Sequence, residues 1–363
     1  MTDQTLGTSP TATRATHEEP LGEFPRVSLV MPIYNEGPYI ARSLDQVLAQ
    51  DYPADRLEVV VADGMSTDNT RQIVADYTRR YPQISMIDNP VRFRAAGLNL
   101  AIAQSTGDIV ICIDGHGETA PDFVRQNVQL FREHPEAWSV GGPYRPSGQN
   151  TFGKAVAIAM SHPCGVGVTT HRFPDYEGYA EGAPFAAFRR WVFDRLGWFD
   201  ELLVRTEDDE FNYRIAQAGG KIYVSPRVRY DYYVRDSVLK LFQQYIQYSF
   251  WRIPVVQKHK RPTTIRQVIP PLFFLAIAIL AVVGVVLRQP LVALALPTVY
   301  LGVLILVGIS LIPRAGFKVA CLVPVAMATM HFAYALGIGY GLYAALFQPN
   351  AWAPSGSMSQ QRR

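Results

Sequence analysis

The amino-acid sequence predicts an α/β fold with a mostly parallel sheet, followed by a C-terminal transmembrane helical segment. Short apolar runs alternate with amphipathic segments as far as residue 143, which is typical of strands covered by helices. From about 265 to 347 charged residues are scarce, although 18% of the whole chain is charged. Two of the apolar runs lead into an acidic residue, Asp63 and Asp114, at the sheet edge where α/β proteins bind ligands.

Four strands are expected in the first part of the domain, because four apolar runs have no internal turn signal. They lie at 26–33, 57–63, 84–87 and 109–113. The intervening segments carry apolar residues at helical spacing and predict helices at 38–50, from about 68 to 81, at 95–104 and at 121–134.

After residue 143 the pattern becomes irregular, with a helical candidate at 152–160 and a helix start near Trp191. Four consecutive acids, 207–210, then open another helix. One or two acids would satisfy the helix dipole, which is the plain structural explanation. Because four neighbouring carboxylates repel one another, we expect at least one to face a cation or a substrate hydroxyl.

Asp114 and His116 follow the 109–113 strand and are separated by one glycine. Oxygen and nitrogen ligands at this spacing could bind a divalent cation that also carries phosphate oxygens. The alternative is that Asp114 is an ordinary turn or N-cap residue.

The C-terminal region contains apolar runs at 268–287, 291–312 and 319–347, each long enough to cross about 30 Å of hydrocarbon. Basic residues gather before the first run, in the segment 253–267, and again between the second and third runs. By the positive-inside rule we expect a multi-pass cell-membrane protein with a cytoplasmic catalytic domain and an external C-terminus. A buried soluble helical domain is the alternative.

Net charge, cysteine spacing and the terminal segments indicate further properties of the protein. The net charge of +3 is too small to indicate nucleic-acid binding. The three cysteines have no metal-binding spacing and fit a reducing compartment. Residues 1–24 lack the apolar core of a signal peptide, and we interpret them and residues 348–363 as disordered tails.

The chain resembles glycosyltransferase family 2 over about residues 26–252. The resemblance lies in Pro32-Ile-Tyr34-Asn35-Glu36, Asp63-Gly-Met-Ser66-Thr-Asp68, Gly97-Leu-Asn99, Asp114-Gly-His116 and Glu207-Asp208, in the family's order. The segments 162–167 and 184–190 are most similar to membrane-attached enzymes of succinoglycan-type exopolysaccharide synthesis. This resemblance implies a nucleotide-diphospho-sugar transferase (GT-A) fold at 25–252, followed by a basic juxtamembrane amphipathic segment at 253–267 and three transmembrane helices at 268–347.

The resemblance also implies roles for individual residues. Nucleotide-sugar binding falls to Pro32, Tyr34, Glu36, Asp63 and Asp114. From its position just before a helix, Arg94 is a further candidate for phosphate binding, and the alternative is an exposed loop arginine with no specific role. Asp114 and His116 would hold Mn²⁺ or Mg²⁺, and an imidazole in place of the more common acid favours Mn²⁺. His116 could instead only hydrogen-bond phosphate.

Asp208, beside Glu207, would be the catalytic base. Arg189, Arg190 and Trp251 are candidates for acceptor or diphosphate contact, against the plainer alternative of packing and surface charge. The segment 247–252 only loosely matches the element of processive synthases, and Trp251 with Arg252 could form an amphipathic approach to the membrane.

The resulting hypothesis is an inverting, metal-dependent glycosyltransferase of the hexosyltransferase class. Its partners would be a nucleotide-diphospho-sugar donor, a lipid-linked acceptor, the membrane and polysaccharide assembly proteins, with no nucleic acid. The alternative is a catalytically silent membrane-bound sugar-nucleotide sensor or assembly subunit.

Overall fold

Strands alternate with helices through the first half of the computed structural model, which describes residues 21–262, 264–348 and 352. The strands are β1 (Val27–Ile33), β2 (Leu57–Asp63), β3 (Ile84–Asp88), β4 (Ile109–Cys112), β5 (Glu118–Thr119), β6 (Ala137–Gly141), β7 (Arg145–Ser147), β8 (Gly178–Tyr179), β9 (Ala187–Arg189), β10 (Lys221–Val224) and β11 (Tyr230–Tyr233). The α-helices of the same domain are α1 (Ile40–Leu48), α2 (Thr70–Arg80), α3 (Arg94–Gln104), α4 (Phe123–Glu133), α5 (Thr151–Met160), α6 (Pro163–Val166), α7 (Trp191–Leu196), α8 (Glu207–Gln217), α9 (Val238–Phe250) and α10 (Arg252–His259).

The main sheet has the order β3-β2-β1-β4-β9-β6-β10-β8. Its first four strands are parallel, so that the carboxyl ends of β1, β2 and β4 meet at one edge. The fold predicted from the sequence is therefore confirmed. A smaller sheet, β5-β11-β7, lies beside it.

The core lies on both faces of the main sheet because side chains alternate along each strand. In β1, Leu29 and Met31 belong to a cluster with residues of α1, α2 and α4. Val30 points to the other face and packs with residues of α3, α7 and α8. All three side chains are fully buried, which explains why β1 reads as an unbroken apolar run.

β9 was not predicted from the sequence. It inserts antiparallel between β4 and β6, and its pairing aligns Arg189 with Ile109 and Ala187 with Ile111. The strand is only three residues long and ends in arginine, so it carries no period-2 pattern that could be recognised.

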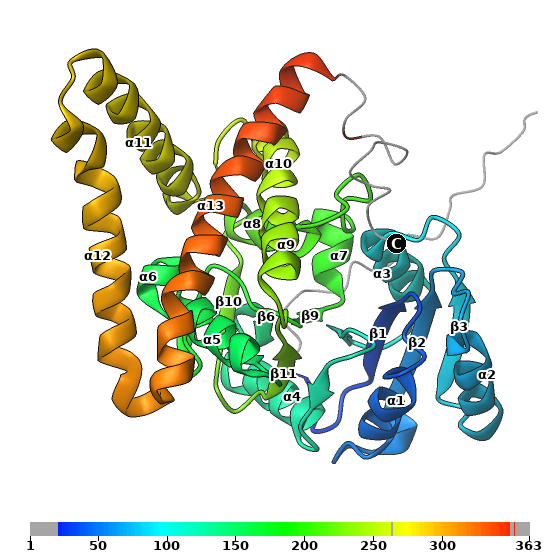
Figure 1. The fold of residues 1–363 in the computed structure, drawn as a ribbon. Coiled ribbons are helices and arrows are strands. Elements are labelled where there is room, and N and C mark those ends of the chain that lie inside the picture. Colours follow the sequence, from blue (N-terminus) through cyan, green and yellow to red (C-terminus); the bar gives the residue numbers. More distant parts are fainter. Residues whose placement is uncertain (1–20, 263, 349–351, 353–363) are drawn as a thin grey trace, which may run out of the picture.

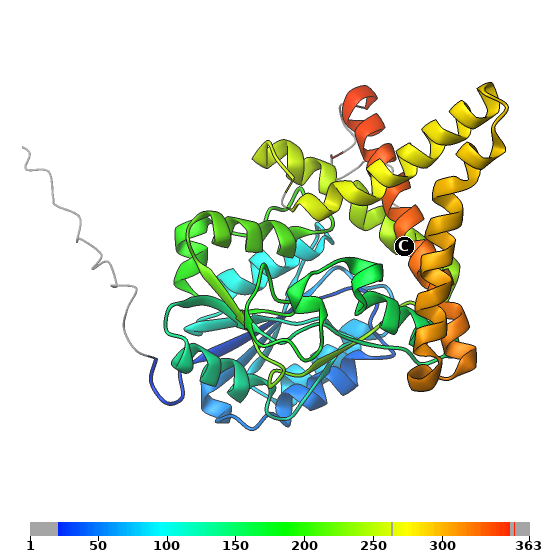
Figure 2. The same cartoon turned by 90° about the vertical axis from the view of Figure 1, so that its left-hand side faces the viewer.

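Three helices follow that are long and apolar enough to cross a membrane: α11 (Ile269–Val286), α12 (Pro290–Ala315) and α13 (Phe317–Phe347). A short helix, η3 (Ile265–Val268), leads into the first of them. Figures 1 and 2 show α11 and α12 standing away from the α/β domain, whereas α13 lies alongside α9. About a third of the residues in an 18-residue apolar stretch of α13 are buried inside the protein.

His331 of α13 faces other helices, as expected for an ionisable residue in an apolar span. Its Nε2 lies 3.1 Å from the carbonyl oxygen of Gly165, and its Nδ1 lies 2.9 Å from the hydroxyl of Tyr300 on α12. Since a carbonyl only accepts, Nε2 donates and Nδ1 accepts from Tyr300.

Residues at three of the predicted domain limits pack against the rest of the protein. The segment 253–267 was predicted as an amphipathic approach to the membrane. Its first part also packs into the protein, because Ile253 and Val255 of α10 are buried. The predicted tails lie mostly outside the described residues. Where they are described they pack on the protein, since the ring of Phe24 meets Tyr52 and that of Trp352 meets Trp251.

Candidate active site

The candidate site lies where β1, β2 and β4 end, and hydrogen bonds between the loops after β1 and β2 shape it. The backbone N–H of Asn35 donates to Ser66 Oγ at 2.9 Å, and that of Glu36 donates to Thr70 Oγ1 at 2.8 Å. The polar residues of both family-like segments therefore hold each other in place, which the sequence did not reveal.

Asp63, the last residue of β2, is fully buried. Its Oδ2 accepts hydrogen bonds from the Ser66 N–H at 3.0 Å and from Arg71 Nη1 at 2.5 Å. Its Oδ1 is buried with no hydrogen-bond donor among the described residues. A buried carboxylate oxygen of this kind is an acceptor suited to the N–H of a nucleobase.

Pro32, near the end of β1, and Tyr34, just after it, each lie against a glycine. A Cβ added to Gly64 would lie 3.3 Å from the Tyr34 ring, so the ring lies against the residue that follows Asp63. A Cβ added to Gly97 of α3 would approach the Pro32 ring to 3.0 Å, which fixes Pro32 under the start of that helix.

Glu36 and His116 form a hydrogen-bonded pair, with His116 Nδ1 2.8 Å from Glu36 Oε1. A carboxylate accepts, so Nδ1 carries the proton, and Nε2 of the neutral ring is free to bind a cation. In the protonated ring Nε2 would instead donate to a phosphate oxygen. Burial opposes ionisation of His116, but the hydrogen bond to Glu36 and the charge of Asp114 outweigh it and raise the pKa of His116.

Arg94, at the start of α3, bridges Asp114 and Glu207. Its Nε lies 3.1 Å from Asp114 Oδ1 and its Nη1 lies 2.8 Å from Glu207 Oε1. Burial raises the pKa of the Asp114 carboxyl, yet the Arg94 charge reverses this effect and lowers it overall. The bridge joins the end of β4 to the start of α8, two elements far apart in the sequence.

The four acids at the start of α8 have different partners. Glu207 pairs with Arg94, Asp209 with Arg252, and Glu210 with Arg214 and Lys258. Asp208 differs, because the only hydrogen bond to its side chain among the described residues comes from the backbone N–H of Asp209, at 2.8 Å.

Asp208 therefore has the properties of a base. Its side chain is reachable by solvent but densely surrounded by protein. Lost hydration, followed by the charges of Asp209 and Glu207, raises the pKa of Asp208 to about 7. A carboxyl with this pKa is ionised and still basic near neutral pH.

The residues present fit a divalent cation that is shared with a substrate. No group of three or more His, Cys, Asp or Glu that could enclose a metal occurs within residues 21–262, 264–348 and 352. Mn²⁺ and Mg²⁺ do not require one, because they bind through one or two protein ligands together with phosphates and water. Asp114 Oδ2 and His116 Nε2 are the two donors that the hydrogen bonds above leave available.

Arg189 and Arg190 lie at the wrong edge of the sheet, which contradicts their prediction as acceptor or diphosphate ligands. Arg189 is buried and donates to the carbonyls of Phe131, Pro135 and Ala137. Arg190 donates to the carbonyls of Gly107 and Ile102, and to Ser105 Oγ, near the start of β4. The antiparallel direction of β9 carries both arginines away from Asp114.

Trp251 is also misassigned as a ligand-binding residue, because its side chain is 1% exposed. It packs against Phe250 and Trp352, and its carbonyl oxygen lies 3.4 Å from Thr206 Oγ1. Its neighbour Arg252, which the sequence had suggested as a membrane-facing residue, instead binds Asp209 next to the base.

Two further residues were missed. Arg71 binds both Asp63 and Asp88, and its position in the first turn of the helix after β2 was the only available signal. Tyr230 accepts from the backbone N–H of Asp114 through its hydroxyl at 3.1 Å, and nothing in the sequence pointed to it.

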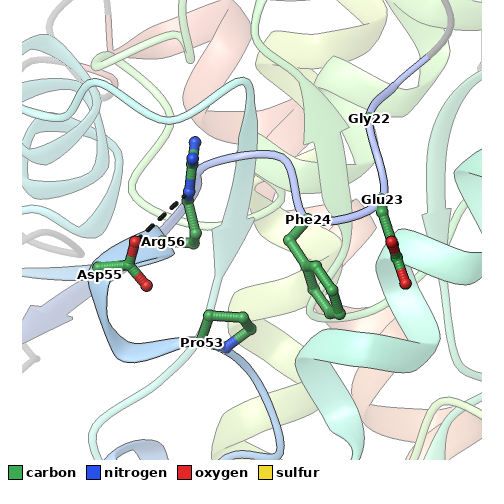
Figure 3. Close-up of a pocket in the computed structure, with 6 residues that line it drawn as sticks. All are labelled: Gly22, Glu23, Phe24, Pro53, Asp55 and Arg56. Atoms are coloured by element: carbon green, nitrogen blue, oxygen red, sulfur yellow. Dashed lines mark ion pairs between the residues drawn. The ribbon is translucent and has the colours of Figure 1, made fainter.

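A pocket elsewhere does not belong to this site. Figure 3 shows its lining residues, which include Phe24, Pro53 and Arg56 and lie where β1 and β2 begin, at the opposite edge of the sheet.

Comparison with known proteins places the chain in a family. The family model described as Glycosyl transferase family 2 matches residues 28–197. The succinoglycan biosynthesis protein ExoA of Rhizobium meliloti is 30% identical, and the match covers 90% of this chain and 88% of ExoA. The dolichyl N-acetyl-α-D-glucosaminyl phosphate 3-β-D-2,3-diacetamido-2,3-dideoxy-β-D-glucuronosyltransferase of Methanococcus voltae is 25% identical over 61% of this chain and 71% of its own length.

A solved structure supports the fold. The mannosyltransferase PcManGT of Pyrobaculum calidifontis, in complex with GDP-Man and Mn²⁺, superposes with a TM-score of 0.53 at 21% identity. The match covers 89% of this chain and 86% of PcManGT. With its GT-A-like α/β domain and its similarity to ExoA along nearly the whole chain, this protein belongs to glycosyl transferase family 2.

Proposed function

We propose that the protein is an inverting glycosyltransferase that moves a sugar from a nucleotide-diphospho-sugar to an acceptor hydroxyl. The observation that carries this proposal is Asp208, the one acid of the α8 start without a cationic partner among the described residues. The charge of Arg94 interacts with both Asp208 and Asp114. The proposed base and the predicted phosphate site therefore lie close together.

The donor would bind along the edge formed by β1, β2 and β4. Asp63 Oδ1 would accept from the base N–H, the Tyr34 ring would stack on the base, and Pro32 would complete the pocket wall. Arg94 would compensate the Asp114 and Glu207 charges and hold α8 at the correct distance.

Asp114 and His116 would hold Mn²⁺ or Mg²⁺ together with the donor diphosphate. When bound, the cation supplies Lewis-acid stabilisation of the charge on the departing nucleoside diphosphate. The hydrogen bond to Glu36 would hold the His116 ring with its proton on Nδ1 and leave Nε2 available for the cation.

Asp208 would accept the proton of the acceptor hydroxyl as its oxygen bonds to the anomeric carbon. The bond from that carbon to the diphosphate oxygen breaks on the opposite face, and the nucleoside diphosphate leaves with the electron pair. One displacement without a covalent intermediate inverts the anomeric configuration.

The acceptor would be lipid-linked, and the catalytic domain would be cytoplasmic. The packing of α13 on α9 supports the first point, because it brings a helix long and apolar enough to span a membrane next to the helix that leads into Arg252. Basic residues before α11 and between α12 and α13 support the orientation. The same proposal includes a hexose as the transferred sugar and polysaccharide assembly proteins as partners.

A panel of nucleotide sugars tests the function. Detergent-solubilised protein is expected to release nucleoside diphosphate from one donor, and faster when a membrane lipid extract is added. Tight nucleotide binding without release from any donor would instead favour the silent sensor or assembly subunit.

Transfer is expected to rise with pH and level off above about 7. The base acts when ionised, so activity is present above its pKa and lost as pH falls through it. At pH 5 the value of kcat/KM should be about a hundredfold below its plateau. Nucleotide affinity measured at each pH separates this effect from protonation of His116, and a flat profile between pH 5 and 8 would argue against Asp208 as the base.

EDTA is expected to reduce transfer to background, and Mn²⁺ should restore it better than Mg²⁺, since imidazole suits Mn²⁺ better. His116→Asp should shift the preference towards Mg²⁺. Calorimetry of nucleoside diphosphate binding with each metal provides a readout apart from activity. Unchanged nucleotide affinity on metal removal would contradict the assignment of Asp114 and His116.

A further inference from the structure

The last apolar helix, α13, packs against the α/β domain along most of its length. Its buried residues lie three or four positions apart and therefore form one stripe along the helix. The stripe consists of Ala320, Val323, Ala326, Met327, Met330, Ala333, Gly337, Gly341 and Ala344. At about 1.5 Å per residue, the part from Val323 to Ala344 is about 32 Å long, close to the thickness of the hydrocarbon core of a bilayer.

This stripe meets helices of the α/β domain. Its first part shares a hydrophobic cluster with Ala155 of α5 and Tyr245 of α9. Farther along, a Cβ added to Gly341 would lie 2.6 Å from Ile253 Cγ1 of α10, so these two helices approach each other closely. Figure 1 shows α13 passing α5, α9 and α10. The helix therefore contacts the catalytic domain over a distance that would otherwise cross a membrane.

The same packing places polar parts of the domain beside α13. α5 and α9 carry exposed lysines, Lys154 and Lys240. Midway along α13, His331 Nε2 donates to the carbonyl oxygen of Gly165 at 3.1 Å, and the neighbouring Cys164 is exposed. Both belong to α6, a single helical turn between irregular segments. Charged side chains and exposed non-helical backbone are strongly disfavoured in hydrocarbon, so packing of this kind and embedding in a bilayer exclude each other.

The other two apolar helices, α11 and α12, have different surroundings. In their apolar stretches only 6% and 11% of the residues are buried, against 33% in α13. They form a hairpin that leaves the domain and returns to it (Figures 1 and 2). Before α11, Arg266 pairs with Glu181 of the domain, and towards the end of α12 a Cβ added to Gly308 would lie 2.9 Å from Pro324 of α13. Hydrocarbon suits the exposed apolar surface of this hairpin.

The distribution of basic residues agrees with this arrangement. Arg314 and Lys318 lie at the junction between α12 and α13, and residues 348–363 contain two arginines and no acidic residue. By the positive-inside rule, both ends of α13 would then lie on the cytoplasmic side.

We infer that α13 does not cross the membrane. Contact with hydrocarbon is left to α11 and α12, whereas α13 is the C-terminal helix of the catalytic domain. Both ends of α13 then lie on the same side of the membrane as that domain, although the apolar run 319–347 alone predicts a third crossing and an external C-terminus. This placement of α13 does not depend on the proposed transferase function.

Labelling of single cysteines in intact cells tests this inference. The background is full-length protein in which the exposed Cys164 and Cys321 are replaced by serine and the remaining Cys112 is buried. One cysteine is then added as Lys318→Cys at the start of α13, at the C-terminus, or as Arg132→Cys on α4, which marks the catalytic domain. A membrane-impermeant maleimide should leave all three unlabelled in intact cells and label all three after permeabilisation. Labelling of one end of α13 but not the other, or of both ends but not Arg132→Cys, would overturn the inference.

A cross-link between α9 and α13 provides a second measurement in the same membranes. The ring centroids of Phe242 and Phe332 lie 6.4 Å apart. Cysteines at these two positions, in the same background, should be joined by a short bis-maleimide before detergent is added, seen as a shift in electrophoretic mobility. Phe242→Cys with Leu346→Cys is the matched control and should show no shift, because Leu346 is 76% exposed and lies about 21 Å farther along α13. If the first pair gave no cross-link, α13 would leave the domain in the membrane and the inference would be wrong.

Discussion

Asp208→Asn is expected to lower the turnover of sugar transfer by about a thousandfold while leaving nucleotide affinity within about twofold. The amide has nearly the shape of the carboxylate but cannot take a proton from the acceptor. The predicted donor contacts, at Asp63, Tyr34 and Asp114, come from other elements and stay intact. The measurement is kcat for nucleoside diphosphate release with acceptor present, together with nucleotide Kd by calorimetry.

Asp194→Asn is the matched control, because Asp194 is an exposed acid on α7 with no ion pair among the described residues. It should retain full activity. If Asp208→Asn also retained activity, the base would have to be another acid. If it lost nucleotide binding as strongly as turnover, Asp208 would be a donor-binding residue.

The same variant should affect stability in the opposite direction. The folded-state pKa of Asp208 is raised, so the native protein holds this proton through the window between the ordinary aspartate pKa and about 7. Across that window the native state binds more protons than the unfolded state, and stability falls as pH rises. Removing the charge should therefore raise the melting temperature at pH 8 and leave it unchanged at pH 4.

The sequence was sufficient for the features that depend on local pattern. The run Leu57–Asp63 shows strand and edge acid together, and β2 has those bounds. The long apolar segments likewise predict α11, α12 and α13, because hydrocarbon-length helices need no tertiary information. The roles of Asp63, Asp114 and Asp208 come from the family resemblance and stay predictions, although Arg94 does join Asp114 to Glu207, the neighbour of Asp208.

What the sequence could not provide were contacts between distant segments. In the sequence, Arg189 is a charged residue next to an irregular segment, which suggests a ligand contact. The antiparallel pairing of β9 shows instead that its N–H groups donate to backbone carbonyls. In the same way, the four acids at the start of α8 look alike in sequence. Their ion-pair partners distinguish them, and these partners lie in other elements: Arg94 on α3, and Arg252 and Lys258 at the two ends of α10.

Gly337→Leu should be the most damaging single change in the three C-terminal apolar helices. α13 approaches α9 so closely at this point that a Cβ would lie 2.0 Å from Ser249 Oγ and 2.5 Å from the Ile246 carbonyl oxygen. The backbone oxygen cannot rotate away, so the two helices must separate, and overpacking of this kind costs about 1–3 kcal/mol. We expect a melting temperature lower by several degrees.

Activity should fall with it, because α9 leads directly into Trp251 and Arg252, which hold the start of α8. Gly339→Leu is the matched control, since a Cβ there meets nothing within 4 Å although the residue lies only two positions along the same helix. The test is to measure the melting temperature and the rate of sugar transfer of both variants in detergent and to compare them with the unmodified protein. Equal behaviour of the two would mean that α13 does not position the α/β domain, whereas damage confined to Gly337→Leu would show that α13, through α9, positions the acids at the start of α8.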